Sequence, residues 1–280
     1  MNALEIKGLT REYPGFLLDH LDLTLPGGCI MGLVGENGAG KTTTIKLILD
    51  MIRKDSGSIT ILGQDNQENI KLIKEEIGVV LDEVGIPGCL TVEQFGKVMQ
   101  YSFSNWDRNE YDRLVRELSL PSGKPFKEFS RGMKMKLGIA AALSHNSRLL
   151  ILDEATSGLD PVVRDEVVDM LRDFVKDEEH SILISSHIVS DLEKLCDYIA
   201  FLHKGKLLLC EEKDRLLSEY GVIHCKAERL LELAPDAILS RRESPYGAEA
   251  VVLRDAVPQD LPVSPVSIEE LFVFMVKEAK

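Results

Sequence analysis

Residues 29–43 read CIMGLVGENGAGKTT, and this stretch decides the fold of the 280-residue chain. Its opening run, 29–34, is apolar and suited to a buried strand, and the apolar residues after position 43 recur at helical spacing. A glycine-rich turn between a strand and a helix directs backbone N–H groups and the positive helix end at one point. Because GENGAGKTT at 35–43 has the spacing of a phosphate-binding loop, the sequence predicts a nucleoside triphosphate site at this turn. The alternative is a chance match in a glycine-rich turn, which the flanking strand and helix disfavour.

The loop residues divide the binding of a triphosphate among backbone, ammonium group and hydroxyl. Gly35, Gly38 and Gly40 let the backbone wrap closely around phosphate oxygens without Cβ clashes. Lys41 is expected to reach the β- and γ-phosphates, and the Thr42 hydroxyl to ligate Mg²⁺. The other loop residues expected to contact the nucleotide are Asn37, Ala39 and Thr43.

Size, charge and cysteine usage narrow the setting of the protein. Its 280 residues suit one full α/β domain with a smaller appendage. No stretch approaches the roughly 18 consecutive apolar residues of a membrane-spanning helix, and residues 1–7 alternate like a strand, unlike a signal peptide. The five scattered cysteines favour a reducing compartment over a disulfide scaffold or a zinc site, and the net charge of −13 disfavours a nucleic-acid surface. The sequence therefore predicts a soluble, cytosolic protein with no nucleic-acid partner.

Strand and helix patterns alternate along most of the chain. Residues 4–34 are predicted to form strands and turns, and residues 85–147 a helical insertion. Further apolar strands are predicted at 77–81, 149–152, 182–184 and 198–202. Alternation of this kind favours a mainly parallel sheet covered on both faces. We therefore expect an α/β domain over residues 1–220.

The last part of the chain, residues 221–280, has a different pattern. It mixes short strand-like pieces with proline-containing loops. A capping box at 267–270 then opens an apolar-striped helix that is expected to reach Lys280. This pattern predicts a small α+β appendage, and no motif in it marks chemistry.

Two adjacent acids end one of the predicted strands. Residues 149–154 read LLILDE, so that Asp153 and Glu154 follow an apolar run. Carboxylates at such a position cost desolvation free energy unless a cation or a reaction needs them. Asp153 is placed to hold Mg²⁺ through water, and Glu154 to polarise an attacking water, as nucleotide hydrolysis requires. The alternative, a solvated strand end, is weakened by the phosphate loop upstream.

A second candidate anion site lies between the insertion and the acidic strand. Residues 129–133 read FSRGM and precede a helix whose apolar positions keep helical spacing. Ser130 and the N–H groups around Gly132 are suited to bind an anion at this helix start, although Ser130 taken alone is an ordinary N-cap. The run ATSGLDP follows the acidic strand at 155–161. FSRGM, the acidic strand and ATSGLDP in this order are more specific than any one of these segments alone.

In this order the motifs resemble those of the ATP-binding cassette (ABC) ATPases, the motor subunits of ABC transporters, over roughly residues 1–220. GENGAGKTT is similar to the family's Walker A motif, LLILDE to Walker B, FSRGM to the LSGGQ signature and SGLD to the D-loop. His187 matches the switch histidine, and Tyr13 the aromatic residue that stacks on adenine. Taken alone, Tyr13 also fits a packing aromatic, and His187 a structural histidine.

The resemblance implies a P-loop NTPase fold with an antiparallel N-terminal β subdomain and an inserted helical subdomain. It implies ATP and Mg²⁺ as cofactors, and ATP hydrolysis coupled to transport with Lys41, Glu154 and His187 as catalytic residues. It also implies a head-to-tail dimer with an identical or related subunit, in which ATP lies between the Walker A loop of one copy and the signature of the other. The further residues implied to contact ATP in this arrangement are Ser130, Gly132 and Asp160.

Three positions in two motifs depart from the family pattern. The strand at 77–81 normally runs into a glutamine that ligates Mg²⁺ and senses the transmembrane partner, and Asp82 stands at that position here. A carboxylate ligates Mg²⁺ more strongly but adds charge beside the γ-phosphate, which slows hydrolysis or makes it depend more on partner docking. Asp82 is therefore expected among the Mg²⁺ ligands. Arg131 replaces the first glycine of the signature and Met133 its glutamine, whereas the serine and the second glycine are kept.

A motor without membrane spans needs integral membrane permease subunits, which implies a peripheral location on the cytoplasmic face of the cell membrane. The insertion offers side chains that suit a docking groove for a partner helix, with ordinary core packing as the alternative. These side chains are Phe95, Met99, Tyr101, Phe103 and Trp106. The single cassette and the small appendage, with SIEELF at 267–272, resemble the ATPases of bacterial ABC-2-type exporters.

Other ABC functions fit the chain less well. A ribosome-associated ABC protein normally carries two cassettes and basic elements, whereas this chain has one cassette and is acidic. A DNA-repair ABC ATPase inserts a long coiled coil between Walker A and the signature, and residues 44–128 are too short and too punctuated for one. An ATP-dependent regulator or clamp that is not coupled to transport stays open, because Asp82 and Arg131 are altered.

Overall fold

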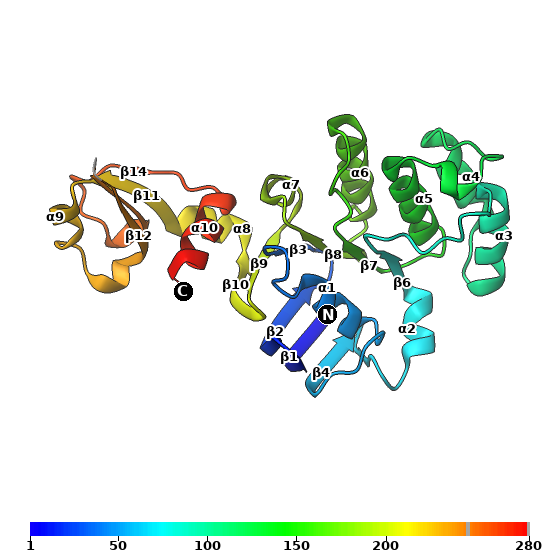
Figure 1. The fold of residues 1–280 in the computed structure, drawn as a ribbon, viewed down its shortest axis with the longest axis horizontal. Helices are drawn as coiled ribbons and strands as arrows, with labels where there is room; N and C mark the ends of the chain where they lie inside the picture. The colour runs from blue at the N-terminus through cyan, green and yellow to red at the C-terminus, as the bar shows by residue number, and fades with distance from the viewer. Residues whose placement is uncertain (245–246, 279–280) are drawn as a thin grey trace.

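The computed structural model describes residues 1–244 and 247–278, which form three β-sheets with helices packed around them. The C-terminal sheet lies at one end of the long axis and the helical insertion at the other, with the remaining two sheets between them (Figure 1). Within the described residues, no helix has both the length and the apolar character that crossing a bilayer requires. The expected helix end at Lys280 lies outside the described residues.

A six-stranded sheet forms the centre of the molecule, in the order β10-β9-β3-β8-β7-β6. Its strands are β3 (Ile30–Val34), β6 (Ile77–Val80), β7 (Leu149–Asp153), β8 (Ser181–Ser186), β9 (Tyr198–His203) and β10 (Lys206–Glu212). Neighbouring strands are parallel except β9 and β10, which pair antiparallel. The predicted mainly parallel sheet is therefore confirmed.

Helices cover both faces of the central sheet, because its apolar strands send alternate side chains into two hydrophobic cores. The covering helices are α1 (Lys41–Ile48), α5 (Arg131–Leu143), α6 (Pro161–Phe174) and α7 (Val189–Leu195). Leu150 and Leu152 of β7 enter the core that contains side chains of α5, α6 and α7. Leu149 and Ile151 enter the core that contains side chains of α1. The ends of β3 and β7 thereby meet the start of α1 at one edge of the sheet.

The second sheet is antiparallel, in the order β2-β1-β4-β5, and shares its core with α1. Its strands are β1 (Asn2–Tyr13), β2 (Phe16–Pro26), β4 (Ser56–Ile61) and β5 (Gln64–Asp65), and α2 (Ile70–Glu76) leads from it to β6. Tyr13 and Phe16 pair at the tip of the β1–β2 hairpin. A Cβ placed on Gly40 would lie 2.9 Å from the Phe16 ring, so this tip reaches the phosphate loop.

The helical insertion lies between β6 and β7, which are neighbours in the sheet. It contains α3 (Val92–Ser102), α4 (Arg108–Glu117), the 3₁₀ turn η1 (Phe126–Glu128) and α5. The capping box that opens α3 has both reciprocal bonds, Gln94 N–H to Thr91 Oγ1 at 3.3 Å and Thr91 N–H to Gln94 Oε1 at 3.0 Å. Buried Tyr111 donates its hydroxyl hydrogen to the Val92 carbonyl at 2.9 Å. The insertion therefore has its own small core.

The C-terminal part forms the third sheet, antiparallel in the order β12-β13-β11-β14. Its strands are β11 (Tyr220–Cys225), β12 (Ile238–Ser244), β13 (Gly247–Leu253) and β14 (Val263–Ser264), and its helices are α8 (Lys213–Glu219), α9 (Ala227–Leu230), η2 (Pro235–Ala237), η3 (Arg254–Ala256) and α10 (Ile268–Glu278). The capping box of α10 is formed, with the Ser267 N–H donating to Glu270 Oε2 at 2.9 Å. The pKa of Glu270 is lowered mainly by this backbone hydrogen bond and, to a smaller extent, by a hydrogen bond from the Ser267 hydroxyl.

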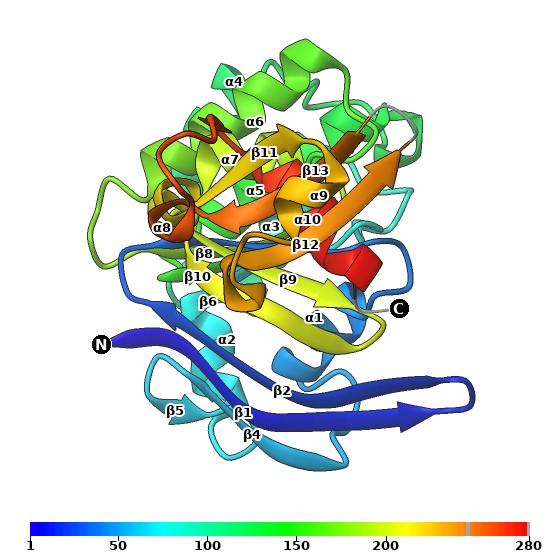
Figure 2. The same ribbon diagram turned by 90° about the vertical axis from the view of Figure 1, so that its left-hand side faces the viewer.

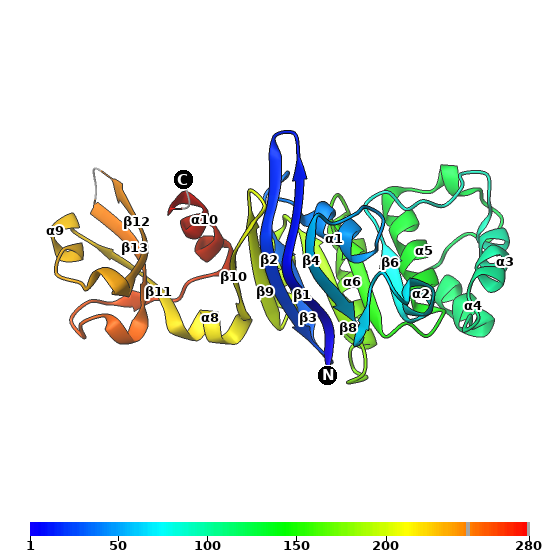
Figure 3. The ribbon, with the colours of Figure 1, turned by 90° about the horizontal axis from the view of Figure 1, so that it is seen from below.

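The helix α10 joins this third sheet to the central one. Figure 3 shows α8 and α10 between the C-terminal sheet and β10, and Figure 2 shows the same layers from the C-terminal side. The Phe272 ring lies 5.2 Å from that of Phe201 in β9, measured between centroids. Buried Leu271 and Phe274 belong to the same hydrophobic cluster as Leu192 of α7. The apolar core thus continues across residue 220, and the division into domains near that residue stays a prediction.

Candidate functional site

The loop between β3 and α1 has the backbone that phosphate binding requires. Gly38 (φ 82°) and Gly40 (φ 113°) lie in the left-handed region that glycine adopts most readily. A Cβ at Gly35 would lie 2.6 Å from the Leu202 carbonyl oxygen, so this position admits no side chain. Gly40 is also the N-cap of α1 and has no side chain to satisfy the first N–H groups of the helix. Those donors are therefore suited to an anion.

A cavity of about 710 Å³ opens beside this loop. Of the residues predicted to form the site, ten line it: Tyr13, Asn37, Gly38, Gly40, Lys41, Thr42, Thr43, Asp82, Glu154 and His187. These residues come from the β1–β2 hairpin, the phosphate loop and the segments that follow β6, β7 and β8. The tertiary fold therefore gathers around one space residues that lie far apart in the sequence.

The carboxylate of Glu154 lies between two basic side chains. Lys41 Nζ is 3.1 Å from Glu154 Oε1, and His187 Nδ1 is 2.7 Å from Glu154 Oε2. Lys41 is only 5% exposed and also donates to the Gly35 carbonyl at 2.7 Å, so its buried charge is paired and hydrogen-bonded. Glu154 has φ 54°, an uncommon backbone conformation for a residue with a side chain. These contacts orient the carboxylate at the wall of the cavity.

Asp153 and Thr42 form the part of the site that suits a magnesium ion. The Thr42 hydroxyl donates to Asp153 Oδ2 at 2.8 Å, and the Ser185 hydroxyl donates to Asp153 Oδ1 at 2.6 Å. A hydroxyl and a carboxylate oxygen in contact beside a phosphate loop fit Mg²⁺, which takes few protein ligands and completes its shell with phosphate oxygens and water. Within residues 1–244 and 247–278, no group of three or more His, Cys, Asp or Glu side chains is placed to hold a metal. The contact between the Thr42 hydroxyl and the Asp153 carboxylate is therefore the feature that fits a magnesium ion here.

Asp82 lines the cavity but has another partner. Its Oδ1 atom is 2.5 Å from Nη2 of Arg131, the first residue of α5. Both side chains are about half exposed, at 51% for Asp82 and 49% for Arg131. The carboxylate expected to ligate Mg²⁺ is thus paired with a guanidinium in this structure.

Of the six predicted residues outside the lining of this cavity, three lie at helix starts. Ser130 caps α5 by accepting the Met133 N–H, at 3.2 Å. Asp160 caps α6, where its carboxylate accepts two backbone N–H groups. A Cβ on Gly132 would lie 3.0 Å from Cγ1 of Val163, so α5 and α6 approach each other closely here.

Ala39 lies in the phosphate loop, and Tyr13 lies at the tip of the β1–β2 hairpin. Ala39 is buried at 1% exposure within the phosphate loop. The Tyr13 ring is half-buried, and the Arg11 guanidinium lies 4.6 Å from its centroid. Arg11 also pairs with Asp55. The pKa of Asp55 lies below its ordinary value, mainly because the Glu12 N–H donates to its carboxylate and, to a smaller extent, because Arg11 does. The hairpin tip that carries Tyr13 is thereby tied to the segment before β4.

Sequence reasoning missed four residues with a part in the site. Phe16, Glu36 and Ser157 also line the cavity, and Ser185 orients Asp153. Ser185 pairs in register with Asp153 across the β7–β8 ladder. The signal available for Ser185 was its position directly after the predicted strand at 182–184 and two residues before His187.

Comparisons with known proteins give the family. The family profile described as ABC transporter matches residues 18–157. The bacitracin transport ATP-binding protein BcrA of Bacillus licheniformis is 39% identical over 193 residues, which cover 68% of this chain and 63% of BcrA. The ABC transporter ATP-binding protein YhcH of Bacillus subtilis (strain 168) is 30% identical over 301 aligned residues, which cover 99% of this chain and 97% of YhcH.

A solved structure of an ATP-binding subunit of an ABC transporter has a TM-score of 0.69 and 27% identity. The structural alignment covers 76% of this chain and 91% of the chain in the solved structure. The P-loop NTPase fold and the resemblance drawn from the motifs are thereby confirmed. The chain belongs to the ABC transporter family, among its ATP-binding ATPase proteins.

Proposed function

We propose that this protein is the ATP-hydrolysing motor subunit of a bacterial ABC exporter of the ABC-2 type. The observation that carries the proposal is the position of Glu154 between Lys41 and His187 on the wall of the cavity. An exporter is favoured by BcrA, whose name assigns it to bacitracin transport, and by the small C-terminal appendage that follows the cassette. The cargo is a property of the membrane subunits.

Each residue around the cavity has a role in this proposal. The N–H groups of the loop and Lys41 bind the β- and γ-phosphates. Thr42 and Asp153 would hold Mg²⁺, and the ion would supply neutralisation of the charge that develops on the phosphates. Glu154 accepts a proton from the attacking water, and His187 keeps the carboxylate oriented. The Tyr13 ring stacks on the adenine.

The proposed assembly is a head-to-tail dimer. Ser130 and Asp160 lie outside the lining of the cavity and cap the helices α5 and α6. The start of α5, with Ser130 and Gly132, is therefore proposed to contact ATP held by the Walker A loop of a second subunit. Closure of the dimer then adds donors to the γ-phosphate, and hydrolysis depends on closure.

Docking to integral membrane subunits on the cytoplasmic face of the membrane is also proposed, on a smaller surface than the sequence suggested. Phe95, Met99 and Trp106 pack in the core of the insertion, and Phe103 stacks on His145 with ring centroids 4.2 Å apart. Core packing therefore accounts for four of the five candidate side chains. Tyr101 is 94% exposed and is the residue proposed to contact a partner helix.

Steady-state ATPase assays test the proposal. The purified chain is compared with the chain reconstituted with a candidate integral membrane subunit, in both cases with Mg²⁺-ATP. We expect turnover in both samples and stimulation by the membrane subunit, together with a cross-link from a cysteine placed at Tyr101. ATP binding without stimulation and without a cross-link contradicts the transporter motor and supports an ATP-dependent regulator.

A further inference from the structure

Two of the three residues that depart from the family pattern, Asp82 and Arg131, touch each other. Asp82 follows β6, and Arg131 is the first residue of α5, yet Arg131 Nη2 and Asp82 Oδ1 are 2.5 Å apart. Both side chains line the cavity that contains Lys41 and Thr42. Because these two departures from the family pattern are in contact in one cavity, we consider their effects together.

The positive charge of Arg131 is unfavourable at its position in α5 unless an anion lies beside it. The positive end of a helix dipole disfavours a cation in the first turn, and the first turn of α5 contains no acidic residue. Asp82 supplies the missing negative charge from a different segment. The guanidinium also lies against Gly158 of the D-loop segment, because a Cβ on Gly158 would be 3.3 Å from Arg131 Nε. Arg131 is therefore held at the junction of three segments.

Asp82 also needs a cation. Glu154 lines the same cavity and is paired with Lys41 and His187, whereas an unpaired carboxylate at Asp82 would repel the phosphates of a nucleotide. A guanidinium stays protonated at all physiological pH values, so that Arg131 neutralises Asp82 permanently. The Asp82–Arg131 pair has a net charge of zero, the same as the glutamine and glycine that the family pattern has at these two positions.

We propose that Arg131 is a positioning residue that holds Asp82 away from the metal, and that the Asp82–Arg131 pair acts as one unit. This inference rests on the proposed function, since it concerns the charge around bound Mg²⁺-ATP. It assigns to Arg131 a role within its own subunit, in addition to the role of the neighbouring Ser130 toward a second subunit.

A double-mutant cycle tests the pair. Its members are D82Q, R131G and the D82Q/R131G variant, which carries both family residues. Binding of Mn²⁺ alone to the full-length protein is followed by the loss of the free-ion electron paramagnetic resonance signal. We expect R131G to bind Mn²⁺ on the order of fivefold more tightly than the wild type, the effect of freeing one half-exposed carboxylate. The D82Q/R131G variant is expected to return to the wild-type value, and R131K, which keeps the cation, to stay near it.

Turnover of Mg²⁺-ATP gives the second readout. Each single variant is expected to lose activity, and the double variant to regain most of it. Equal Mn²⁺ affinity of R131G and D82Q/R131G, or losses of activity that multiply in the double variant, would show that Arg131 acts independently of Asp82 and would overturn the inference.

Two controls separate this outcome from others. Arg148 and Glu76 form an ion pair at 3.0 Å outside the cavity, with side chains 41% and 30% exposed, and the R148Q/E76Q cycle is expected to leave Mn²⁺ affinity unchanged. Thermal unfolding monitored by circular dichroism verifies that every variant is folded. Absence of ATP binding by the wild type overturns the proposed function, whereas the Mn²⁺ cycle still reports on the pair.

Discussion

Replacing Glu154 by glutamine preserves the shape of the side chain but removes its charge and its ability to accept a proton. The carboxylate contacts Lys41 at 3.1 Å and His187 at 2.7 Å through different oxygen atoms. An amide has only one acceptor oxygen, so one of the two basic side chains loses its partner. The substitution therefore affects proton transfer first and the orientation of the carboxylate's neighbours second.

The expected loss of turnover follows from the role of Glu154. A positioned general base contributes about 10²–10⁴-fold to a reaction rate. We take about 10³-fold, which raises the activation free energy by about 4 kcal/mol. Binding of ATP is expected to be kept, because the N–H groups of the loop, Lys41 and Thr42 are unchanged. The Glu154→Gln variant also carries one less negative charge near the phosphates.

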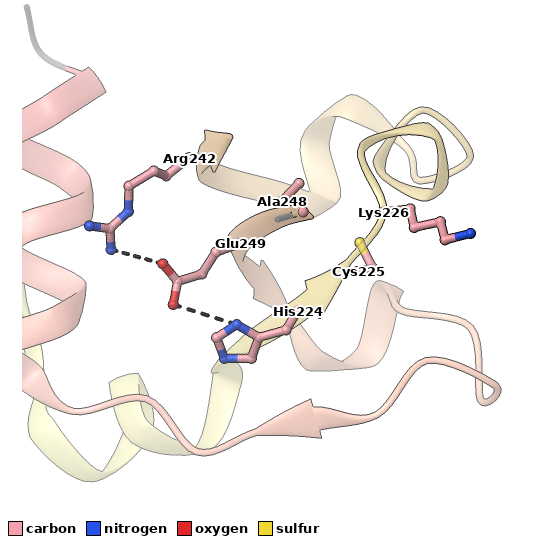
Figure 4. Close-up of a pocket in the computed structure, with 7 residues that line it drawn as sticks. His224, Cys225, Lys226, Arg242, Ala248 and Glu249 are labelled. Carbon is pink, nitrogen blue, oxygen red and sulfur yellow. Dashed lines mark hydrogen bonds and ion pairs between the residues drawn. The ribbon is translucent and has the colours of Figure 1, made fainter. Parts of the chain in front are cut away.

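Two measurements separate binding from turnover. Phosphate release under saturating Mg²⁺-ATP reports turnover, and fluorescence titration with a labelled ATP analogue reports affinity. Glu249→Gln is a matched control, because the Glu249 carboxylate also lies between a histidine and a cation, His224 and Arg242, in the C-terminal pocket (Figure 4). A substitution there is expected to change kcat by less than about twofold, as for surface substitutions away from a site.

A clear result refutes this reasoning. If Glu154→Gln keeps wild-type-like hydrolysis, Glu154 is not the residue that polarises the water. If both glutamine variants lose activity equally, the loss reflects a general effect on the protein. If affinity and turnover fall together in Glu154→Gln alone, Glu154 supports nucleotide binding in place of proton transfer.

Two further predictions concern the base end of the cavity and the C-terminal helix. Tyr13→Ala removes a stacking surface worth about 1–3 kcal/mol, so ATP affinity should fall by about 5-fold to 150-fold with kcat nearly unchanged. Tyr13→Phe should restore the affinity, and unchanged affinity of Tyr13→Ala in equilibrium titration contradicts the stacking role. Phe274→Ala empties a site that is 3% exposed, so we expect the free energy of unfolding to fall by about 3 kcal/mol in urea unfolding followed by circular dichroism. A loss confined to a separate early transition would instead indicate that α10 unfolds independently of the central sheet.

Local features of the fold were predictable wherever a short-range physical rule controls them. Glycines that permit left-handed backbone, an apolar run before them and helical spacing after them locate the phosphate loop. The capping boxes at Thr91 and Ser267 follow from a side chain three residues from its partner, and both are formed. Family membership was predictable for a related reason, since the order of short motifs is a property of the chain itself.

Long-range pairings were not predictable from spacing. The Asp82–Arg131 pair joins residues 49 positions apart that come near each other only when α5 packs against β6. Mg²⁺ ligation by Asp82 stays a prediction. The aromatic side chains of the insertion suggested a docking surface, whereas the structure buries Phe95 and leaves Tyr101 exposed. Periodicity indicates that a side chain is apolar, but it does not tell which neighbours cover it.

The sequence alone determined the central parallel sheet, the phosphate loop and the family, because strand patterning, glycine backbone freedom and motif order are written in consecutive residues. Only the tertiary structure decided that Glu154 lies between Lys41 and His187, that Asp82 pairs with Arg131, and that α10 shares a core with the central sheet. The physical reason is that charge pairing and core packing act over a few ångströms in space. The separation of two residues along the chain does not determine the distance between them in the folded protein.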